Sequence, residues 1–391
     1  MLYIITPKSG TWSVHNIREK MGSEWTDQIE HLTYDCLADR TNLRTGAYIF
    51  AGLGVVSPVQ RALAVEAWTS LEHASSSVRL LNHPGRAMGR VDLLKTLHDE
   101  GRNDFRVFTP AEAAHHSPRY PVFVREAEYH TGNLTGLLTT DEALESALND
   151  LARRGFAPSG LLVVEYCHTA DEAGIFRKYS AFRIGDAILP RYLSLGTEWM
   201  VKENRSDPPE GPLYDSARLA EEVEYVRTNP HEAWLRETFE LANIEYGRID
   251  YGIWQGRLQV WEINTHPGMG AYPGAVKTDA QLHRRELRMP AKQHFYDRWT
   301  PVLADLAATP SDATVPFQIS DALASRFAQD RKERARKERQ RTSMNQLMRH
   351  AGRLIPKVPV LRPLRQAASG FIQRKITART QISSSDDARQ P

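Results

Sequence analysis

The most informative stretch of the chain is GRIDYGIWQGRLQVWEINTHPG, residues 247–268. Apolar and polar residues alternate on both sides of Gln255-Gly256, a pattern typical of two antiparallel strands joined by a tight turn. If the loop has three residues, Asp250 lies directly opposite Glu262 on the neighbouring strand. Asn264 shares the face of Glu262 because strand side chains alternate. The stretch therefore predicts a hairpin that brings two carboxylates and an amide together.

Two carboxylates that face each other across a sheet repel, which favours a cation between them. Carboxylate and amide oxygens are hard ligands of the kind that Mg²⁺ takes together with water and phosphate oxygens, and Mn²⁺ accepts the same set. The alternative is a solvated hairpin face with unrelated acidic residues. The opposite face argues against this alternative because its residues are apolar and indicate burial: Ile249, Tyr251, Ile253, Trp261 and Ile263. The THPGM turn, residues 265–269, then offers backbone N–H groups suited to anions.

Further upstream, short apolar strands alternate with amphipathic helices, which is the pattern of an open α/β layer. Strands are expected at 2–5 and 47–53, and a third in VRLLNHP, residues 78–84. Helices are expected after Pro58 and over about 90–100.

The pattern becomes richer in strands from Pro121 onward. Strands are expected in PVFVRE, residues 121–126, and in LLVVEY, residues 161–166. A second hairpin is expected around Gly185-Asp186. Helical segments are expected over 141–154 and within 218–243.

The residues of the first hairpin resemble the ATP-grasp superfamily, which includes D-alanine:D-alanine ligases, glutathione synthetases and ligases that add glutamate to ribosomal protein tails. The resemblance is carried by GRID, residues 247–250, and EINTHPGM, residues 262–269. It implies that Asp250, Glu262 and Asn264 hold the magnesium ions that bridge the ATP phosphates. It also implies that Arg248, and main-chain groups near the Pro-Gly turn at Gly268, stabilise the oxyanion of a tetrahedral intermediate.

Three other segments resemble the nucleotide-binding parts of that family. The resemblance implies that Glu165 contacts the adenosine end of ATP, and that Arg177 or Lys178 faces the phosphates. The segment 121–136 departs from the family, because Arg125 stands where a strand lysine is expected. An arginine keeps the positive charge but not the compact geometry of an ammonium group. The flap that follows contains Glu126, Glu128 and His130 in place of glycines and serines.

The fold class implied by the resemblance combines α/β and α+β parts. An N-terminal open α/β layer, the pre-ATP-grasp domain, would be followed by a two-lobed ATP-grasp module with antiparallel sheets and by a basic C-terminal tail. The expected boundaries are 1–105 for the layer, 106–195 for the small lobe, 196–325 for the large lobe with the metal site, and 326–391 for a partly disordered tail.

The composition of the 391 residues is that of a globular protein, with 41% hydrophobic and 25% charged residues. It excludes global disorder and collagen-like repeats. No apolar run is long enough for a membrane-spanning helix, and the N-terminus lacks the pattern of a signal peptide, so a cytoplasmic protein is expected. The two cysteines, Cys36 and Cys167, form neither a CxxC pair nor a zinc site and are expected to be buried and reduced.

The charge is distributed unevenly along the chain. Residues 331–391 hold 16 Lys plus Arg and 4 Asp plus Glu, a net +12, whereas residues 1–330 carry a net −10. The basic tail predicts solvated disorder, contact with an anionic membrane surface, which would make the protein peripheral, or contact with an acidic partner. Nucleic acid is disfavoured because Phe371 is the single aromatic residue among the tail's charges.

The resulting hypothesis is an ATP-dependent ligase that joins a small-molecule carboxylate to an amine through an acyl phosphate, with ATP and Mg²⁺ bound between two lobes. One alternative keeps the fold but transfers phosphate to a hydroxyl, which would make the protein a kinase. Another is an inactive nucleotide-binding scaffold recruited through the basic tail. A homodimer is an expectation from analogy with the family alone.

Overall fold

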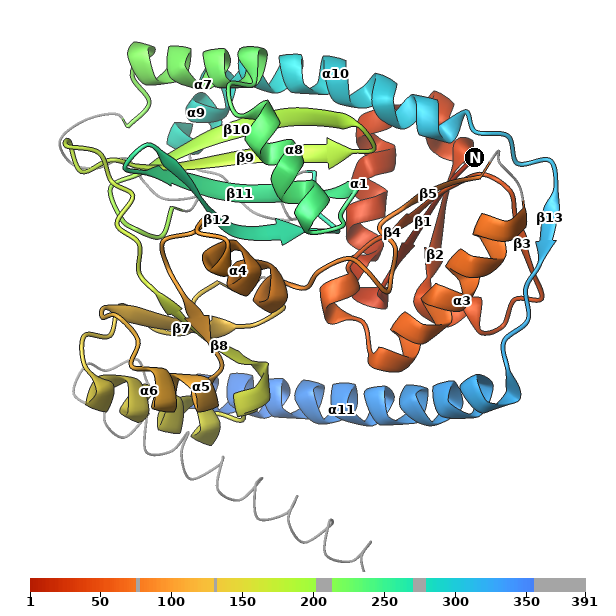
Figure 1. The fold of residues 1–391 in the computed structure, drawn as a ribbon, viewed down its shortest axis with the longest axis horizontal. Helices are drawn as coiled ribbons and strands as arrows, with labels where there is room; N and C mark the ends of the chain where they lie inside the picture. The colour runs from red at the N-terminus through yellow and green to blue at the C-terminus, as the bar shows by residue number, and fades with distance from the viewer. Residues whose placement is uncertain (75–77, 130–131, 202–212, 270–278, 355–391) are drawn as a thin grey trace, which may run out of the picture. The chain divides into compact units, whose positions relative to one another are not determined.

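The computed structural model describes residues 1–74, 78–129, 132–201, 213–269 and 279–354 (Figure 1). The chain divides into two compact units. The first unit contains Met1–Arg106 and Cys167–Phe327, and the second contains Val107–Tyr166 and the chain from Ala328 onward. Each unit has sheets of its own, and the candidate site described below lies within the first.

The first unit begins with a parallel sheet in the order β2-β1-β4-β5. Its strands are β1 (Leu2–Thr6), β2 (Ile29–Thr33), β4 (Ala47–Phe50) and β5 (Arg79–Leu81). Every residue of β1 and β4 is buried, as expected for parallel strands covered on both faces. The covering helices include α1 (Thr11–Met21) and α3 (Pro58–Ala74) (Figure 1). The expected strands near residues 2–5 and 47–53, and the helix after Pro58, are confirmed.

The second sheet of this unit is antiparallel, in the order β10-β9-β11-β12. Its strands are β9 (Phe176–Ile184), β10 (Ala187–Gly196), β11 (Tyr246–Trp254) and β12 (Arg257–Asn264). Gly185 and Asp186 form the turn between β9 and β10, as expected. The combination of an α/β layer with antiparallel sheets confirms the expected fold class, whereas the tail beyond residue 354 lies outside the described residues.

The register of the β11–β12 hairpin corrects one assumption made from the sequence. Trp254 pairs with Arg257, so the loop has two residues and not three. Its residues, Gln255 and Gly256, have φ of 48° and 74°, as the preferred two-residue turn requires. A two-residue loop alone would put Asp250 opposite Trp261. Asp250 nevertheless pairs with Glu262 because the register shifts between Asp250 and Tyr251, which makes Trp261 the extra residue of a β-bulge.

Helices cover both faces of the antiparallel sheet. On one face, Tyr225 of α7 (Ser216–Thr228) packs edge-on against Tyr179 of β9, with ring centroids 5.0 Å apart. On the other face, Phe295 of α10 (Met289–Ala307) packs against Phe182 of β9 at 5.5 Å. The helical content expected within 218–243 is confirmed by α7 and α8 (Glu232–Leu241).

The two four-stranded sheets of the first unit are joined at Asn82, directly after β5. This residue is fully buried and has φ of 67°, in the left-handed region that asparagine tolerates better than most residues. Its side-chain oxygen accepts hydrogen bonds from the backbone N–H groups of Glu245 and Tyr246, at 2.8 Å each. Its amide nitrogen donates to the carbonyls of Phe50 and Tyr246. One side chain therefore connects the ends of β4 and β5 to the start of β11.

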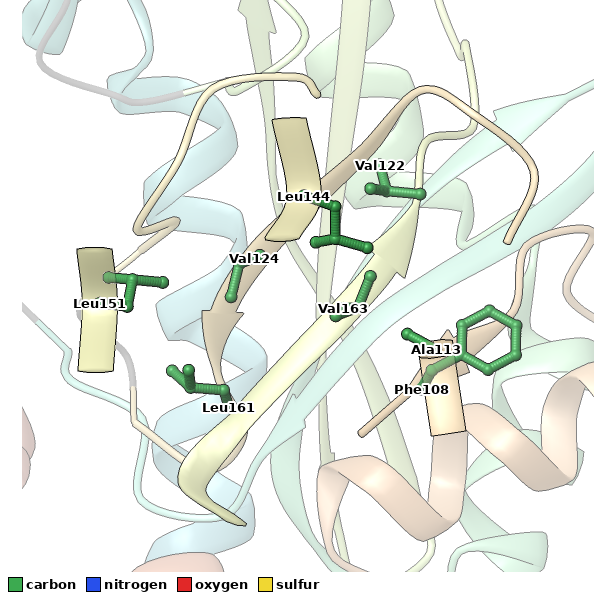
Figure 2. Packing of buried hydrophobic residues seen from close by; sticks show 8 residues of the cluster. All are labelled: Phe108, Ala113, Val122, Val124, Leu144, Leu151, Leu161 and Val163. Carbon is green, nitrogen blue, oxygen red and sulfur yellow. The ribbon is translucent and has the colours of Figure 1, made fainter. Parts of the chain in front are cut away.

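The second unit contains the three-stranded antiparallel sheet β6-β8-β7. Its strands are β6 (Val107–Phe108), β7 (Val122–Glu126) and β8 (Leu161–Glu165), and its helices include α5 (Pro110–His116) and α6 (Asp141–Arg153). Figure 2 shows how side chains from these elements meet in one core, with Leu144 and Leu151 of α6 placed over Val124, Leu161 and Val163 of the sheet. The expected strands at 121–126 and 161–166 are confirmed.

A short pair of strands and further helices complete the described part of the chain. Strands β3 (Asn42–Arg44) and β13 (Thr314–Pro316) pair with each other. The other helices are α2 (Tyr34–Leu37), α4 (Arg90–Asp99), α9 (Asp279–Leu287) and α11 (Asp321–Leu354), and the 3-10 turns are Lys8–Gly10, Ser23–Gln28, Leu53–Val55 and Pro158–Gly160. Among the described helices, none combines the length and apolar composition that crossing a bilayer requires. Cys36 is exposed and Cys167 is partly exposed, so the expected burial of both cysteines is wrong.

Candidate active site

A single row of residues crosses all four strands of the antiparallel sheet. Tyr192 of β10 pairs with Ser180 of β9, Ser180 pairs with Asp250 of β11, and Asp250 pairs with Glu262 of β12. Residues that are directly opposite each other in neighbouring strands share a face of the sheet. We call this side of the sheet the site face. It also carries residues two positions along the same strands, namely Lys178, Arg248 and Asn264.

Two β-bulges determine which residues stand at the two ends of this row. One is at Arg191 in β10, where the register shifts between Pro190 and Tyr192, and the other is at Trp261 in β12. A shift of one residue moves a side chain to the opposite face of a sheet, so each bulge decides which residue joins the row. Without them, Arg191 and Trp261 would stand where Tyr192 and Glu262 are. Bulges that re-aim a side chain are common next to active sites.

Asp250 lies in the middle of the row, and it is 5% exposed. Its Oδ1 accepts hydrogen bonds from Ser180 Oγ at 2.8 Å and from Arg248 Nε at 3.0 Å. Its Oδ2 accepts from Arg248 Nη2 at 3.3 Å and lies 3.7 Å from Lys178 Nζ. The carboxylate is therefore held by two cationic side chains and a hydroxyl.

Glu262 has a different cationic partner. Arg90, the first residue of α4, donates from Nη2 to Glu262 Oε2 at 2.5 Å. The side chains are 3% and 12% exposed, respectively, so the pair is largely removed from water. The repulsion expected between Asp250 and Glu262 is thus offset by Arg90, Arg248 and Lys178. Sequence reasoning missed Arg90 because it lies 172 positions before its partner and no local pattern links the two.

The cations of the site face are held in their charged forms. Burial alone would lower the pKa of Arg248, but the nearby Asp250 carboxylate, with Tyr192 and Glu262, raises it above its ordinary value. Burial likewise opposes the charge of Lys178, whereas Tyr192 and Asp250 raise its pKa. Both side chains therefore remain positive at neutral pH and suit a ligand that carries negative charge.

The turn after β12 is fixed against the parallel sheet of the same unit. Asn264 Oδ1 accepts from the backbone N–H of His266 at 2.9 Å, and Thr265 Oγ1 accepts from the backbone N–H of Gly52 at 3.1 Å. A Cβ added at Gly268 would clash with the ring of Trp12 in α1, so any larger residue there would require Trp12 to move. The contact gives Gly268 a packing role beside the oxyanion role implied by the resemblance.

The three residues expected to hold magnesium fit that ion in the chemistry of their donor atoms. Asp250 and Glu262 supply carboxylate oxygens and Asn264 supplies an amide oxygen, on neighbouring positions of one face. Mg²⁺ usually takes one or two carboxylates and completes its octahedron with water and phosphate oxygens. Among the described residues, no group of three or more His, Cys, Asp or Glu side chains offers an all-protein cage. These three donors therefore suit a cation whose remaining ligands are phosphate oxygens.

The structure separates the two residues that the sequence left as alternatives for the phosphates. Lys178 lies on the site face, next to Asp250. Arg177 points to the opposite face, where its guanidinium pairs with Asp171 at 2.5 Å and with Glu221 of α7 at 2.7 Å. Hydrogen bonds donated to Glu221 raise the pKa of Arg177, while burial opposes this rise and Asp171 adds to it. Lys178 is therefore the residue of this pair that belongs to the row.

The two remaining candidates lie in the second unit. Glu165, at the end of β8, is 2% exposed and accepts from Arg119 through its backbone N–H at 2.7 Å and through Nε and Nη2 at 3.0 and 2.8 Å. Arg125 in β7 pairs with Leu162 and forms a bridge with Asn133. His130 lies outside the described residues. The contacts of Glu165 and Arg125 with ATP stay predictions.

No protein-family model matches the sequence, and no curated protein matches it. Several solved structures are similar to it. The D-alanine–D-alanine ligase of Bacillus anthracis complexed with ATP is 13% identical, over 78% of this chain and 98% of that one, with a TM-score of 0.44. The D-alanine–D-alanine ligase of Coxiella burnetii is 13% identical over 86% and 99%, with a TM-score of 0.41. A RimK domain ATP-grasp protein of Sphaerobacter thermophilus is 12% identical over 76% and 98%, with a TM-score of 0.39.

Proposed function

We propose that the chain is an ATP-dependent ligase that joins a small carboxylate to an amine through an acyl phosphate. The observation that carries the proposal is the row across the antiparallel sheet. It combines hard oxygen ligands, Asp250 and Glu262, with two partly buried cations, Lys178 and Arg248, on one face. Transfer of a phosphoryl group requires groups of this kind, because the reaction depends on positioning the reactants and on neutralising the negative charge of the phosphates.

The proposed reaction has two steps. The substrate carboxylate attacks the γ-phosphorus of ATP, the bond to ADP breaks, and an acyl phosphate forms. The amine then attacks the acyl carbon, inorganic phosphate leaves, and the amine nitrogen loses a proton. Lys178 holds phosphoryl oxygens, and Arg248 stabilises the oxyanion that develops in the second step.

Hydrogen bonds within the protein orient these side chains. Asp250 orients Arg248 through two hydrogen bonds, and Ser180 in turn orients Asp250. Asp250, Glu262 and Asn264 are the residues that would hold Mg²⁺, which when bound neutralises charge on the phosphates. Arg90 fixes one oxygen of Glu262 and so limits how that side chain can turn.

The proposal is tested by replacing Glu262 with Gln. The amide keeps the shape of the side chain and an oxygen that can accept from Arg90, but removes the charge. We expect the release of inorganic phosphate from Mg-ATP, in the presence of pooled amino acids and small carboxylates, to fall at least 100-fold. Glu245→Gln is the matched control, because Glu245 is a carboxylate of the same unit that bonds to the backbone of Asn82 and not to the row.

Each outcome separates the ligase from its alternatives. Phosphate release that needs a component of the pool and Glu262 supports a ligase. ADP without free phosphate indicates a kinase, and wild-type protein that neither binds nor turns over Mg-ATP rejects the ligase. Unchanged turnover in Glu262→Gln rejects Glu262 as a metal ligand.

The basic tail is proposed to act in recruitment to an anionic membrane surface or an acidic partner, and not in the chemistry. Its residues from 355 to 391 lie outside the described structure. Deletion of these residues is expected to leave phosphate release unchanged while abolishing binding to vesicles that contain phosphatidylserine. Loss of turnover in the truncated protein would contradict this division.

A further inference from the structure

Tyr192 is the residue of the row to which no role has been given. The bulge at Arg191 places it opposite Ser180, two strands from Asp250. Neighbouring strands are about 4.8 Å apart, so the backbones of Tyr192 and Asp250 are separated by about 10 Å. A tyrosine side chain is long enough to reach back over much of that distance. Tyr192 therefore closes the end of the site face that lies opposite Glu262.

The ring of Tyr192 lies among cations. The charged groups of Lys178, Arg248 and Arg288 are each 6.0 Å from the ring centroid. Lys178 and Arg248 are the same two side chains that engage Asp250. An anion that touched both of them would therefore be within reach of the phenol hydroxyl.

The backbone beside Tyr192 is fixed by a buried ion pair. Arg288 donates to Glu222 of α7 from Nε at 2.7 Å and from Nη2 at 2.6 Å. Glu222 also accepts from the backbone N–H of Leu193, and Arg288 donates to the carbonyl of Leu193. Both polar groups of the residue after Tyr192 are thus held by side chains, in addition to the strand pairing. The backbone next to Tyr192 is therefore fixed before a ligand binds, which lowers the entropic cost of a contact with a ligand.

The hydroxyl of Tyr192 makes no hydrogen bond to any residue that the structure describes. Other tyrosines of this unit differ: the hydroxyls of Tyr225 and Tyr251 donate to acceptors in the protein, and Tyr214 accepts from the backbone N–H of Leu195. Tyr192 is only partly buried, so its hydroxyl can donate to a ligand. A hydrogen bond to a charged acceptor is stronger than one to a neutral acceptor.

We propose that Tyr192 is a substrate-contacting residue whose hydroxyl donates a hydrogen bond to an anionic oxygen held between Lys178 and Arg248. The oxygen belongs to a phosphoryl group or to a carboxylate, and these share the chemistry that the site recognises. The inference deepens the proposed ligase function and rests on it for the identity of the substrate. The hydrogen bond itself depends only on an anion reaching the two cations.

The test compares wild type with Tyr192→Phe, which keeps the ring and removes only the hydroxyl. Tyr3→Phe is the matched control, because Tyr3 is a buried tyrosine of the parallel sheet whose hydroxyl bonds to Ser311. Inorganic phosphate and acetate serve as probes in titration calorimetry, and urea unfolding verifies that both variants fold. We expect Tyr192→Phe to weaken binding of one probe by about 10- to 100-fold, the range that loss of one hydrogen bond to a charged group spans. Tyr3→Phe should bind both probes as wild type does.

The outcomes distinguish the source of the oxygen and separate this inference from the proposed function. Weaker phosphate binding assigns the contact to the phosphoryl group, and weaker acetate binding assigns it to the carboxylate. If wild type binds neither probe, or if Tyr192→Phe binds both unchanged, the inference is overturned even when Mg-ATP turnover is present. If turnover is absent but Tyr192→Phe still weakens anion binding, the inference holds and the ligase assignment fails. With active protein, a decrease in kcat/KM for one substrate, with the KM of the other unchanged, identifies the same source independently.

Discussion

The two faces of the antiparallel sheet use the same strands in opposite ways. On the face away from the row, four aromatic rings pack against one another with centroids 5.0–6.0 Å apart, those of Tyr179, Tyr225, His231 and Tyr251. We call these four residues the tyrosine cluster. On the site face, the same strands carry Lys178, Asp250 and Arg248, which are charged. The hydroxyls of the cluster bond to other groups of the protein, whereas charged side chains gather on the site face.

The hydrogen bonds of the tyrosine cluster run in one direction. Tyr225 donates to the carbonyl of Ser180, because a carbonyl can only accept. Tyr251 therefore donates to Tyr225, and His231 Nδ1 must carry the proton that it shares with Tyr251. The chain ends at the backbone of Ser180, whose side chain supports Asp250 on the opposite face. From the difference between the faces we expect the cluster to provide rigidity and the site face to provide function.

The largest expected effect comes from breaking the charge balance of the site face. Asp250→Ala leaves Arg248 and Lys178 beside each other without their shared carboxylate. We expect the free energy of unfolding to fall by about 3–5 kcal/mol, the range for removing one partner of a buried ion pair, and turnover to be lost. Urea unfolding measures the first effect and phosphate release the second.

Asp250→Asn is the control for this prediction, because the amide keeps one acceptor oxygen for Ser180 and Arg248. It should recover part of the stability without recovering turnover. Equal stability of wild type and Asp250→Ala would mean that Arg248 and Lys178 do not need Asp250 to offset their charges. The proposed electrostatic difference between the two faces would then be wrong.

A smaller effect is expected on the opposite face. Tyr251→Phe interrupts the hydrogen-bond chain between His231 and Tyr225 but keeps the stacked ring. We expect unfolding to become easier by about 1–2 kcal/mol, the cost of leaving a buried polar group without its partner. Phosphate release by the folded protein should be unchanged, because the ring and the register of β11 are preserved. A variant that is stable but inactive would show that the cluster contributes to function, contrary to the division drawn above.

The comparison also explains what could be predicted from the sequence. Alternation of apolar and polar residues in β11 and β12 placed Asp250, Glu262 and Asn264 on one face, because a period of two is a local property. The pairing of Asp250 with Glu262 was correct although the assumed loop was one residue too long. The bulge at Trp261 compensates for the shorter loop, and a bulge leaves no clear signal in a single sequence.

The residues that sequence reasoning did not find are those fixed by tertiary contacts. Arg90 reaches Glu262 from another element, and Tyr192 joins the row only because β10 bulges at Arg191. Arg177 and Lys178 could not be separated without knowing which face each one takes. The parallel sheet was more predictable than the site, because strands buried on both faces read as continuous apolar runs. Interactions between distant segments were thus the part that the sequence pattern did not reveal.

The smallest expected effect is a pH dependence confined to the tyrosine cluster. Burial lowers the pKa of His231 below its ordinary value of 6.5. In the unfolded chain this histidine takes up a proton as the pH falls below about 6.5, whereas in the folded protein it does so only at lower pH. The unfolded state then binds more protons, so stability is full above pH 6.5 and falls as the pH decreases through the lowered pKa.

Urea unfolding of wild type and His231→Phe between pH 7.5 and 5 should show a smaller acid-dependent loss of stability in the variant. Parallel curves for the two proteins would show that His231 is not the source of the acid sensitivity, and the predicted link to the cluster would fail.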